Sequence, residues 1–293
     1  MLRCPACLQL NFMQYKDLAS HFAKRAEKSD PEHVMWLNRN ITKYQTTKEA
    51  LSEKLALYFD TDSLKFWIIN KMKEKFFTEP HLFIQKMQNP DKGTIAGYVI
   101  EHHYFLKQWV KSCALIMANT DNEKIQNYEI ENIISEFHGT INIPSHHSLL
   151  LRMGESYGIS QEYVYKSKPL KETENAINFW DKICGENSSL EGMAAMHTLE
   201  LIANKNFKGY GARYTYFDPI ILNNGSITNE AVDFLKEGYQ ADVLHSEEAL
   251  DLIEEYIPES MVQSCQAISV KSMDYFSEYL YARVRRGEML ENK

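Results

Sequence analysis

The fold is decided by the stretch Tyr98-Val-Ile-Glu-His-His-Tyr-Phe-Leu-Lys-Gln-Trp-Val-Lys-Ser-Cys-Ala-Leu-Ile-Met-Ala-Asn119. It belongs to a helix expected over residues 94–119, and its apolar side chains fall on nearly every side of that helix. A helix that is apolar all round lies in the interior of a protein. The stretch therefore predicts the central helix of an all-α bundle.

The segments on either side also show helical periodicity. Thr46-Thr47-Lys48-Glu49 resembles a capping box at the start of a helix. Turn residues are scarce, with 12 Gly and 8 Pro in 293 residues, and no strand run is found after Tyr44. Helices are expected over residues 50–59, 60–77, 80–88, 94–119, 123–137, 146–157, 170–184, 189–204, 228–256 and 258–286. We predict a small N-terminal module over residues 1–44 and a helical domain over residues 45–293.

Charge and composition exclude several classes of protein. The formal net charge is −8, which disfavours nucleic acid as a partner because phosphate binding needs a basic surface. No apolar run approaches the roughly 20 residues of a membrane helix. The five cysteines are an odd number in a mid-sized chain, which favours a reducing cytoplasm over a disulfide framework.

Two cysteines near the N-terminus predict a zinc site. Cys4-Pro5-Ala6-Cys7 has the spacing of a zinc knuckle. Phe12, Leu18 and His21 follow in an order that resembles the second half of a Cys2His2 finger, but the usual second His is missing. His33 is the next histidine and the expected fourth ligand; the alternative is that both cysteines are free thiols. The predicted zinc ligands are Cys4, Cys7, His21 and His33.

Asp242 and His245 mark a second candidate site. In a helical projection of residues 228–256, Asp242 lies near the middle of the apolar face, and His245 lies one turn further along that face. A buried carboxylate is costly unless it is paired or bound to a metal. A structural hydrogen bond between Asp242 and His245 is the simpler alternative.

Three further residues add candidate iron ligands to this site. Glu101 lies in the central apolar helix, Glu136 ends the next helix, and His146 follows ten residues later. Carboxylates and imidazoles without thiolate are the ligands of a carboxylate-bridged di-iron centre in a helical bundle. The sequence predicts that Glu101, Glu136, His146, Asp242 and His245 surround one point.

The same residues resemble a known family. The central stretch resembles that of the haem-oxygenase-like seven-helix fold of the pyrroloquinoline-quinone synthesis protein C and thiaminase II superfamily. Glu136-Phe-His-Gly139 and the segment His146–Gly158 resemble its branch of di-iron oxidases, and Asp242-x2-His245 matches the end of that branch's His-x3-Asp-x2-His motif. The resemblance covers roughly residues 50–286. The sequence differs from the family at Gly238, where the motif has its first His. The candidates to replace that missing ligand are His138, Glu200 and, least favoured, Glu237.

Other residues received simpler interpretations. A thiaminase-like activity would need a cysteine nucleophile, and Cys113 and Cys184 are interpreted as small core residues. Arg283-Val-Arg-Arg286 is interpreted as a solvated helix end. A substrate cavity is expected beside the metal, lined by Tyr104 or Phe105 and by residues 210–216.

The resemblance implies an oxidoreductase. Iron, as one or two ions, and O2 would oxidise a small organic substrate, with electrons from an external reductant. The rival hypothesis is a non-enzymatic module in which a zinc finger and a degenerate helical domain bind a ligand or partner. The expected setting is the cytoplasm, without a membrane partner, and a homodimer remains an alternative to a monomer.

Overall fold

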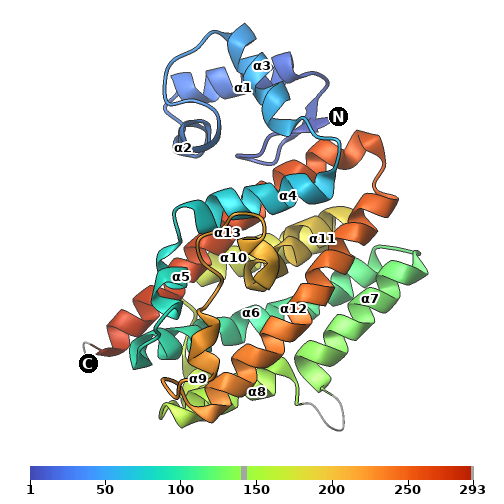
Figure 1. Ribbon diagram of the computed structural model, residues 1–293. Helices are drawn as coiled ribbons and strands as arrows, with labels where there is room; N and C mark the ends of the chain where they lie inside the picture. Colours follow the sequence, from blue (N-terminus) through green and yellow to red (C-terminus); the bar gives the residue numbers. More distant parts are fainter. Residues whose placement is uncertain (140–143, 292–293) are drawn as a thin grey trace.

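The computed structural model describes residues 1–139 and 144–291, except the side chains of Lys205 and of residues 239–246. Apart from two short strands at the N-terminus, its regular elements are helices (Figure 1). In chain order they are β1 (Leu2–Arg3), β2 (Leu10–Phe12), α1 (Tyr15–Glu27), α2 (Pro31–Asn40), α3 (Lys48–Phe59), α4 (Leu64–Lys73), η1 (Glu74–Thr78), α5 (Leu82–Met87), α6 (Lys92–Ala118), α7 (Glu123–Ile133), η2 (Ile134–His138), α8 (His146–Ser156), α9 (Gln161–Lys166), α10 (Lys171–Glu186), α11 (Ser189–Met196), η3 (His197–Ala203), η4 (Lys205–Lys208), η5 (Pro219–Leu222), α12 (Asn229–Tyr256) and α13 (Glu259–Glu291).

Helix α6 is the centre of the bundle, as its sequence predicts. It packs against α7, α8, α10 and α13, and its residues from Gly93 to Glu101 are buried. Within the described residues, no helix combines the length and apolar character needed to cross a bilayer. The predicted all-α bundle with a small N-terminal module is therefore confirmed.

Glycines allow α6 and α13 to touch through their backbones. A Cβ atom on Gly97 would lie 1.9 Å from the carbonyl oxygen of Arg283, and one on Gly287 would lie 2.4 Å from that of Gly93. Both distances are far shorter than van der Waals contact with rigid backbone atoms. Helices α6 and α13 therefore cross at a point where side chains have no room.

Gly97→Ala is expected to lower the free energy of unfolding by about 3 kcal/mol or more, the upper end of typical overpacking costs. Gly185→Ala is the matched control, because Gly185 lies in α10 and a Cβ there would meet its nearest atom at 3.9 Å. That control should be neutral or stabilising by about 0.5–1 kcal/mol, since alanine is the better helix former. Urea denaturation measures both; equal effects would contradict the close crossing.

Helix α3 is grouped with the N-terminal helices. It packs against α1 rather than joining the bundle, and Figure 1 shows α1, α2 and α3 gathered at one end of the molecule. Trp36 of α2 stacks on Phe59 at the end of α3, with ring centroids 6.4 Å apart. These contacts group α3 with the N-terminal helices, to about residue 59, whereas the sequence places the boundary at residue 44.

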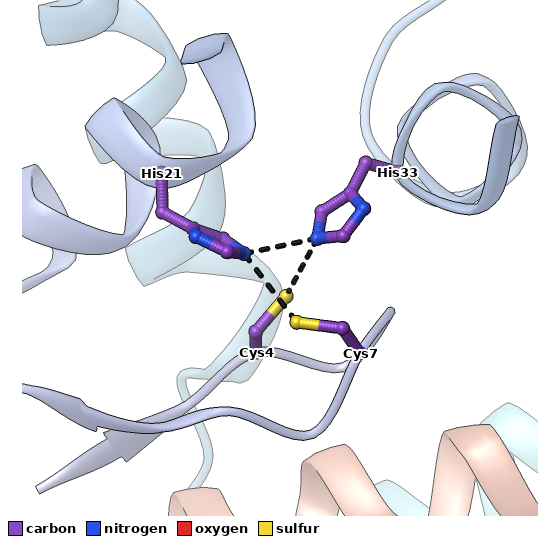
Figure 2. A group of neighbouring side chains, drawn as sticks. All are labelled: Cys4, Cys7, His21 and His33. Atoms are coloured by element: carbon purple, nitrogen blue, oxygen red, sulfur yellow. Dashed lines mark hydrogen bonds between the residues drawn. The ribbon is translucent and has the colours of Figure 1, made fainter. Parts of the chain in front are cut away.

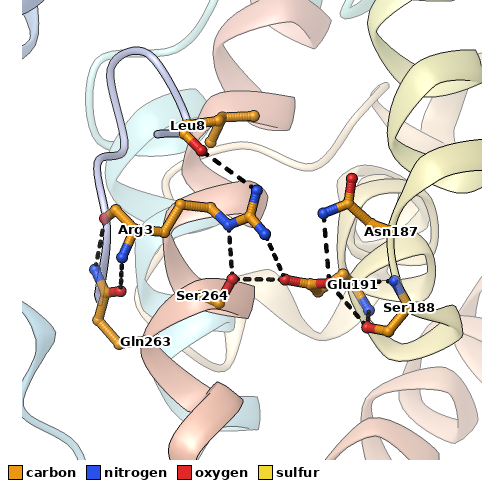
Figure 3. Close-up of polar contacts among 7 residues, drawn as sticks. All are labelled: Arg3, Leu8, Asn187, Ser188, Glu191, Gln263 and Ser264. Carbon is orange, nitrogen blue, oxygen red and sulfur yellow. Dashed lines mark hydrogen bonds and ion pairs between the residues drawn. The ribbon is translucent and has the colours of Figure 1, made fainter. Parts of the chain in front are cut away.

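Arg3 fixes the module to the bundle (Figure 3). Its backbone N–H donates to Oε1 of Gln263 at 2.7 Å, and its carbonyl accepts from Nε2 of the same residue at 3.0 Å. Its guanidinium donates to Ser264 at 2.7 Å and forms an ion pair with Glu191 at 2.9 Å. Because these groups are buried, the strand that precedes the Cys4–Cys7 knuckle is held against α11 and α13.

Candidate metal centres

Cys4, Cys7, His21 and His33 converge at one point, as the sequence predicts (Figure 2). The knuckle that follows β1 carries the two cysteines, α1 carries His21, and α2 carries His33. Their four ligand atoms all lie within 4.8 Å of one another. The free-thiol alternative does not explain why two imidazoles face the same two sulfurs.

The spacing of these atoms fits a tetrahedral zinc ion. Zinc bonds of about 2.3 Å to sulfur and 2.0–2.1 Å to nitrogen give S···N edges of about 3.6 Å. Cys4 Sγ lies 3.6 Å from His33 Nε2, and Cys7 Sγ lies 3.5 Å from His21 Nε2. Burial raises the pKa of the Cys4 thiol, while a hydrogen bond with Cys4 is the main cause that lowers the pKa of Cys7 to about 3. One of the two thiolates that zinc requires is therefore favoured even without metal.

Asp30 orients one of the zinc ligands. Its Oδ1 accepts from Nδ1 of His33 at 2.8 Å, which leaves Nε2 to face the sulfurs. The same carboxylate caps α2 by accepting from the backbone N–H of His33 at 3.3 Å. Outer-sphere carboxylates of this kind set the tautomer and ring angle of a metal-binding histidine.

Asp30→Ser is expected to weaken zinc binding about 10–100-fold, the usual cost of losing such a partner. Serine retains an N-cap for α2, so the variant separates orientation of His33 from helix capping. Asp121→Asn, at an exposed position, is the control. Competition with a chromogenic chelator measures the affinity, and an unchanged affinity in Asp30→Ser would show that His33 needs no orienting partner.

A cavity of about 80 Å³ lies among the helices of the bundle. Most of its wall is aromatic or aliphatic, contributed by α6, η3, α12 and α13. Three sets of polar residues contribute to it: the pair of Glu136 and His146, the single residue Glu200, and the pair of Arg283 and His102. All five of these polar residues line the cavity.

Glu136 and His146 meet at the cavity, as predicted. His146 Nδ1 lies 2.8 Å from Glu136 Oε1, and both residues are buried. Among the described residues, Glu136 Oε2 has no hydrogen-bond partner. Glu136 lies in η2, one of two π-helical turns in the described residues, and such turns are frequent at functional sites. A buried carboxylate oxygen without a partner is a position suited to a metal.

Glu200, a candidate substitute in the sequence, also reaches the cavity. The expected helix over residues 189–204 changes to a 3-10 helix at His197, where residues three apart lie above one another. His197 and Glu200 therefore share a side, with Nδ1 and Oε1 3.7 Å apart.

The sequence analysis missed Glu129 and His197 as a buried pair. His197 Nε2 lies 2.8 Å from Glu129 Oε1, and neither side chain is exposed. Burial opposes the charged imidazole, but the carboxylates of Glu129 and Glu200 outweigh it and raise the pKa of His197 to about 10. Glu129 lies seven residues before Glu136, on nearly the same side of the helix. This spacing is the feature of the sequence from which Glu129 could have been recognised. Through His197, this pair contacts Glu200, which lines the cavity.

Glu101 does not join this group. Its Oε1 accepts from Arg286 Nε at 2.7 Å, and its Oε2 accepts from Thr173 Oγ1 at 2.5 Å and from the Leu170 N–H at 3.1 Å. Both oxygens therefore have partners, and the residue does not line the cavity. The prediction that Glu101 needs a buried partner holds, but the partner is an arginine. The interpretation of residues 283–286 as a solvated helix end is wrong, because α13 continues to Glu291 and buries Arg283.

The other candidate ligands have separate outcomes. His138 is exposed, and its Nδ1 lies 2.9 Å from the carbonyl oxygen of Gly139, so it is not a cavity residue. The side chains of Asp242 and His245 lie outside the described residues. Their helix, α12, packs against α8 and η3, which carry His146 and Glu200. Gly238, at the departure from the motif, lines the cavity.

The expected cavity walls are correct in part. Phe105 and Tyr216 line the cavity, whereas Tyr104 donates to the carbonyl of Ser167. Cys113 and Cys184 are each 1% exposed, and burial raises both thiol pKa values, that of Cys184 to about 12. None of the described residues that line the cavity is a cysteine.

Comparisons with known proteins agree with both parts of the chain. The profile of the TENA/THI-4/PQQC family matches residues 61–287, and that of a C2H2 type zinc-finger matches residues 1–60. No curated protein matches the sequence significantly.

Similar solved structures support the fold alone. A domain of unknown function with a heme oxygenase-like fold from Shewanella denitrificans OS217 has a TM-score of 0.57 at 19% identity and covers 85% of this chain and 96% of its own. A TenA homologue from P. horikoshii OT3 has a TM-score of 0.57 at 14% identity, covering 80% and 98%. A cadd-like protein of unknown function from Nostoc punctiforme PCC 73102 has a TM-score of 0.53 at 15% identity, covering 82% and 97%.

Proposed function

The chain belongs to the TENA/THI-4/PQQC family, and on that premise we propose that it is an oxidoreductase that uses a non-haem iron centre and O2 to oxidise a small organic molecule. The observation that carries the proposal is that three buried residues, Glu136, His146 and Glu200, line one largely apolar cavity. The family includes enzymes, and a cavity of this kind is the usual form of a small-molecule site.

The donor set fits iron. Carboxylate oxygen and imidazole nitrogen suit ferrous iron, whereas a soft thiolate set would favour zinc or an iron–sulfur cluster. Glu136 Oε2 supports the fit, because it is a buried oxygen without a partner among the described residues. Asp242 and His245, from the helix beside His146 and Glu200, are proposed to complete the centre. Glu101 is left out of it because its carboxylate is already bound by Arg286.

When bound, iron would supply electrons and Lewis acidity for a reaction with O2. The chain's own groups hold and shield the site. Phe105, Trp109 and Phe234 line the cavity, and apolar walls of this kind reduce its water content, which strengthens the electrostatic interactions inside it. The buried Glu129–His197 pair fixes the side of η3 from which Glu200 points.

Gly238 determines how many iron ions we expect each chain to bind. It lines the cavity at the position where the resemblance calls for a histidine, and it offers no side-chain donor. We therefore expect one tightly bound iron and a second that is weaker. The rival, a non-enzymatic binding module, gains support from this same position, so the proposal needs a test that reports chemistry rather than binding alone.

Oxygen consumption by anaerobically loaded protein provides that test. Full-length protein with bound Fe(II) should consume O2 faster than the same concentration of free Fe(II), and Glu200→Ala should slow this uptake at least about tenfold, as loss of a ligand or its orientation does. Glu186→Ala, at an exposed position of α10, is the control. Uptake no faster than that of free iron would favour the binding module.

A further inference from the structure

Arg283 is a buried cation on the cavity wall. It is 1% exposed and lies on α13 where that helix crosses α6. Its guanidinium carbon is 4.2 Å from the ring centroid of Tyr98, 4.5 Å from that of Tyr279 and 4.9 Å from that of Phe83. Aromatic faces stabilise such a cation but do not neutralise its charge.

The hydrogen bonds of Arg283 also go to neutral groups. It donates to the Tyr216 hydroxyl at 2.5 Å, to His102 Nδ1 at 2.8 Å and to the Tyr279 hydroxyl. Burial, and then the charge of Arg283, lower the pKa of His102 well below its usual range, so that the ring is a neutral acceptor. Three of the five guanidinium N–H groups are thus used, and Nε has no partner among the described residues.

Two other arginines with little exposure are each neutralised by a carboxylate. Arg3 pairs with Glu191 at 2.9 Å, and Arg286 pairs with Glu101 at 2.7 Å. No described carboxylate forms an ion pair with Arg283. A buried charge without a counter-ion is costly unless a ligand supplies one, and Arg283 lines the cavity, a space in which a ligand would fit.

We propose that Arg283 binds the carboxylate of the substrate, and that the substrate is a short carboxylic acid. This rests on the proposed function and narrows it to a class of molecule. The Nε–H and one N–H of Nη1 are not used by the contacts above, and a carboxylate oxygen is the acceptor that forms the strongest hydrogen bonds with a guanidinium. Glu136 and Glu200 reach the cavity as well, and their negative charge keeps the acid group at the arginine.

The rest of the wall fits the hydrocarbon part of such an acid. Phe105, Leu106, Phe234 and Leu235 contribute apolar surface. The cavity volume of about 80 Å³ is about half of the 150 Å³ that holds benzene in an engineered cavity. The ligand would therefore be short, with its acid group at Arg283 and its carbon chain along the apolar wall.

Calorimetric titration with propionate and with propionamide tests this, because the two probes differ in charge but hardly in shape. Full-length protein carrying zinc should bind propionate about 10–100-fold more tightly than propionamide, the usual gain of a charge-assisted hydrogen bond. The preference should appear both with and without added Fe(II). The iron-free titration makes this result independent of the proposed iron centre.

Arg283→Met should remove the preference for propionate, whereas Arg285→Met should keep it, because Arg285 pairs with Glu172 at a half-exposed position. Equal affinity for the two probes, or no binding of either, in the wild-type protein overturns the proposal even if Arg283→Met fails to fold. Retention of the preference in a folded Arg283→Met protein overturns it as well.

Discussion

Replacing Cys4 by alanine is expected to abolish zinc binding and to unfold much of residues 1–59 while the helical bundle stays folded. Structural zinc contributes about 10–16 kcal/mol of apparent binding free energy in small finger peptides. A module of about 60 residues with a small core depends strongly on such a contribution. Cys4 is fully buried at the centre of the ligand set, so water cannot replace its thiolate easily.

Cys265→Ala is the matched control for that variant. Cys265 is also fully buried, but it lies in α13 and belongs to no ligand cluster of the described residues. It should lose only packing energy and keep its zinc. Metal content by plasma mass spectrometry and hydrogen exchange of the α1 amides measure the two effects. Full zinc in Cys4→Ala, or unchanged protection of α1, would contradict the account of the module.

Glu129→Ala is expected to lower the free energy of unfolding by about 3–5 kcal/mol, the usual cost of removing one partner of a buried ion pair. The reason is that His197 is charged and fully buried, and its closest counter-ion would be lost. Urea denaturation followed by circular dichroism measures the change.

Two further variants separate this loss from general effects of substitution. Glu131→Ala, two residues later at an exposed position, should change stability by less than about 0.5 kcal/mol. The double variant Glu129→Met, His197→Leu should recover much of the loss, since apolar replacements of a buried pair are often neutral or better. A loss in Glu129→Ala no larger than in Glu131→Ala would mean that His197 is neutral in the folded protein.

Local sequence rules were sufficient for the parts of this protein whose residues are close in the chain. The all-round apolar character of residues 94–119 predicted α6 because burial on every side needs no knowledge of the neighbours. The spacing of Cys4, Cys7 and His21 predicted that these side chains meet, because a knuckle and the helix that follows it fix their positions. The prediction that His33 joins them required an assumption about the turn before α2, and the structure brings His33 to the same point.

The other side-chain contacts could not be predicted, because they depend on which helices pack together in the folded protein. Glu101 and Glu136 looked equivalent as acids in buried helices, but Arg286 lies across from the first and the cavity lies beside the second. The burial of Arg283 had a signal in the sequence, since Tyr279, Leu280 and Gly287 share its side of α13. The pairing of His197 with Glu129 depends on a 3-10 turn that the helical pattern of residues 189–204 does not reveal.

Metal analysis of three anaerobically loaded proteins tests the central claim, that the chain holds zinc and iron at two independent sites. The wild-type protein should contain one zinc and between one and two irons per chain. Glu136→Ala should lose its iron and keep its zinc and helical content, whereas Cys4→Ala should lose its zinc and keep its iron. A wild-type protein that retains no iron after desalting, or a Glu136→Ala protein that retains as much as the wild type, would contradict the account.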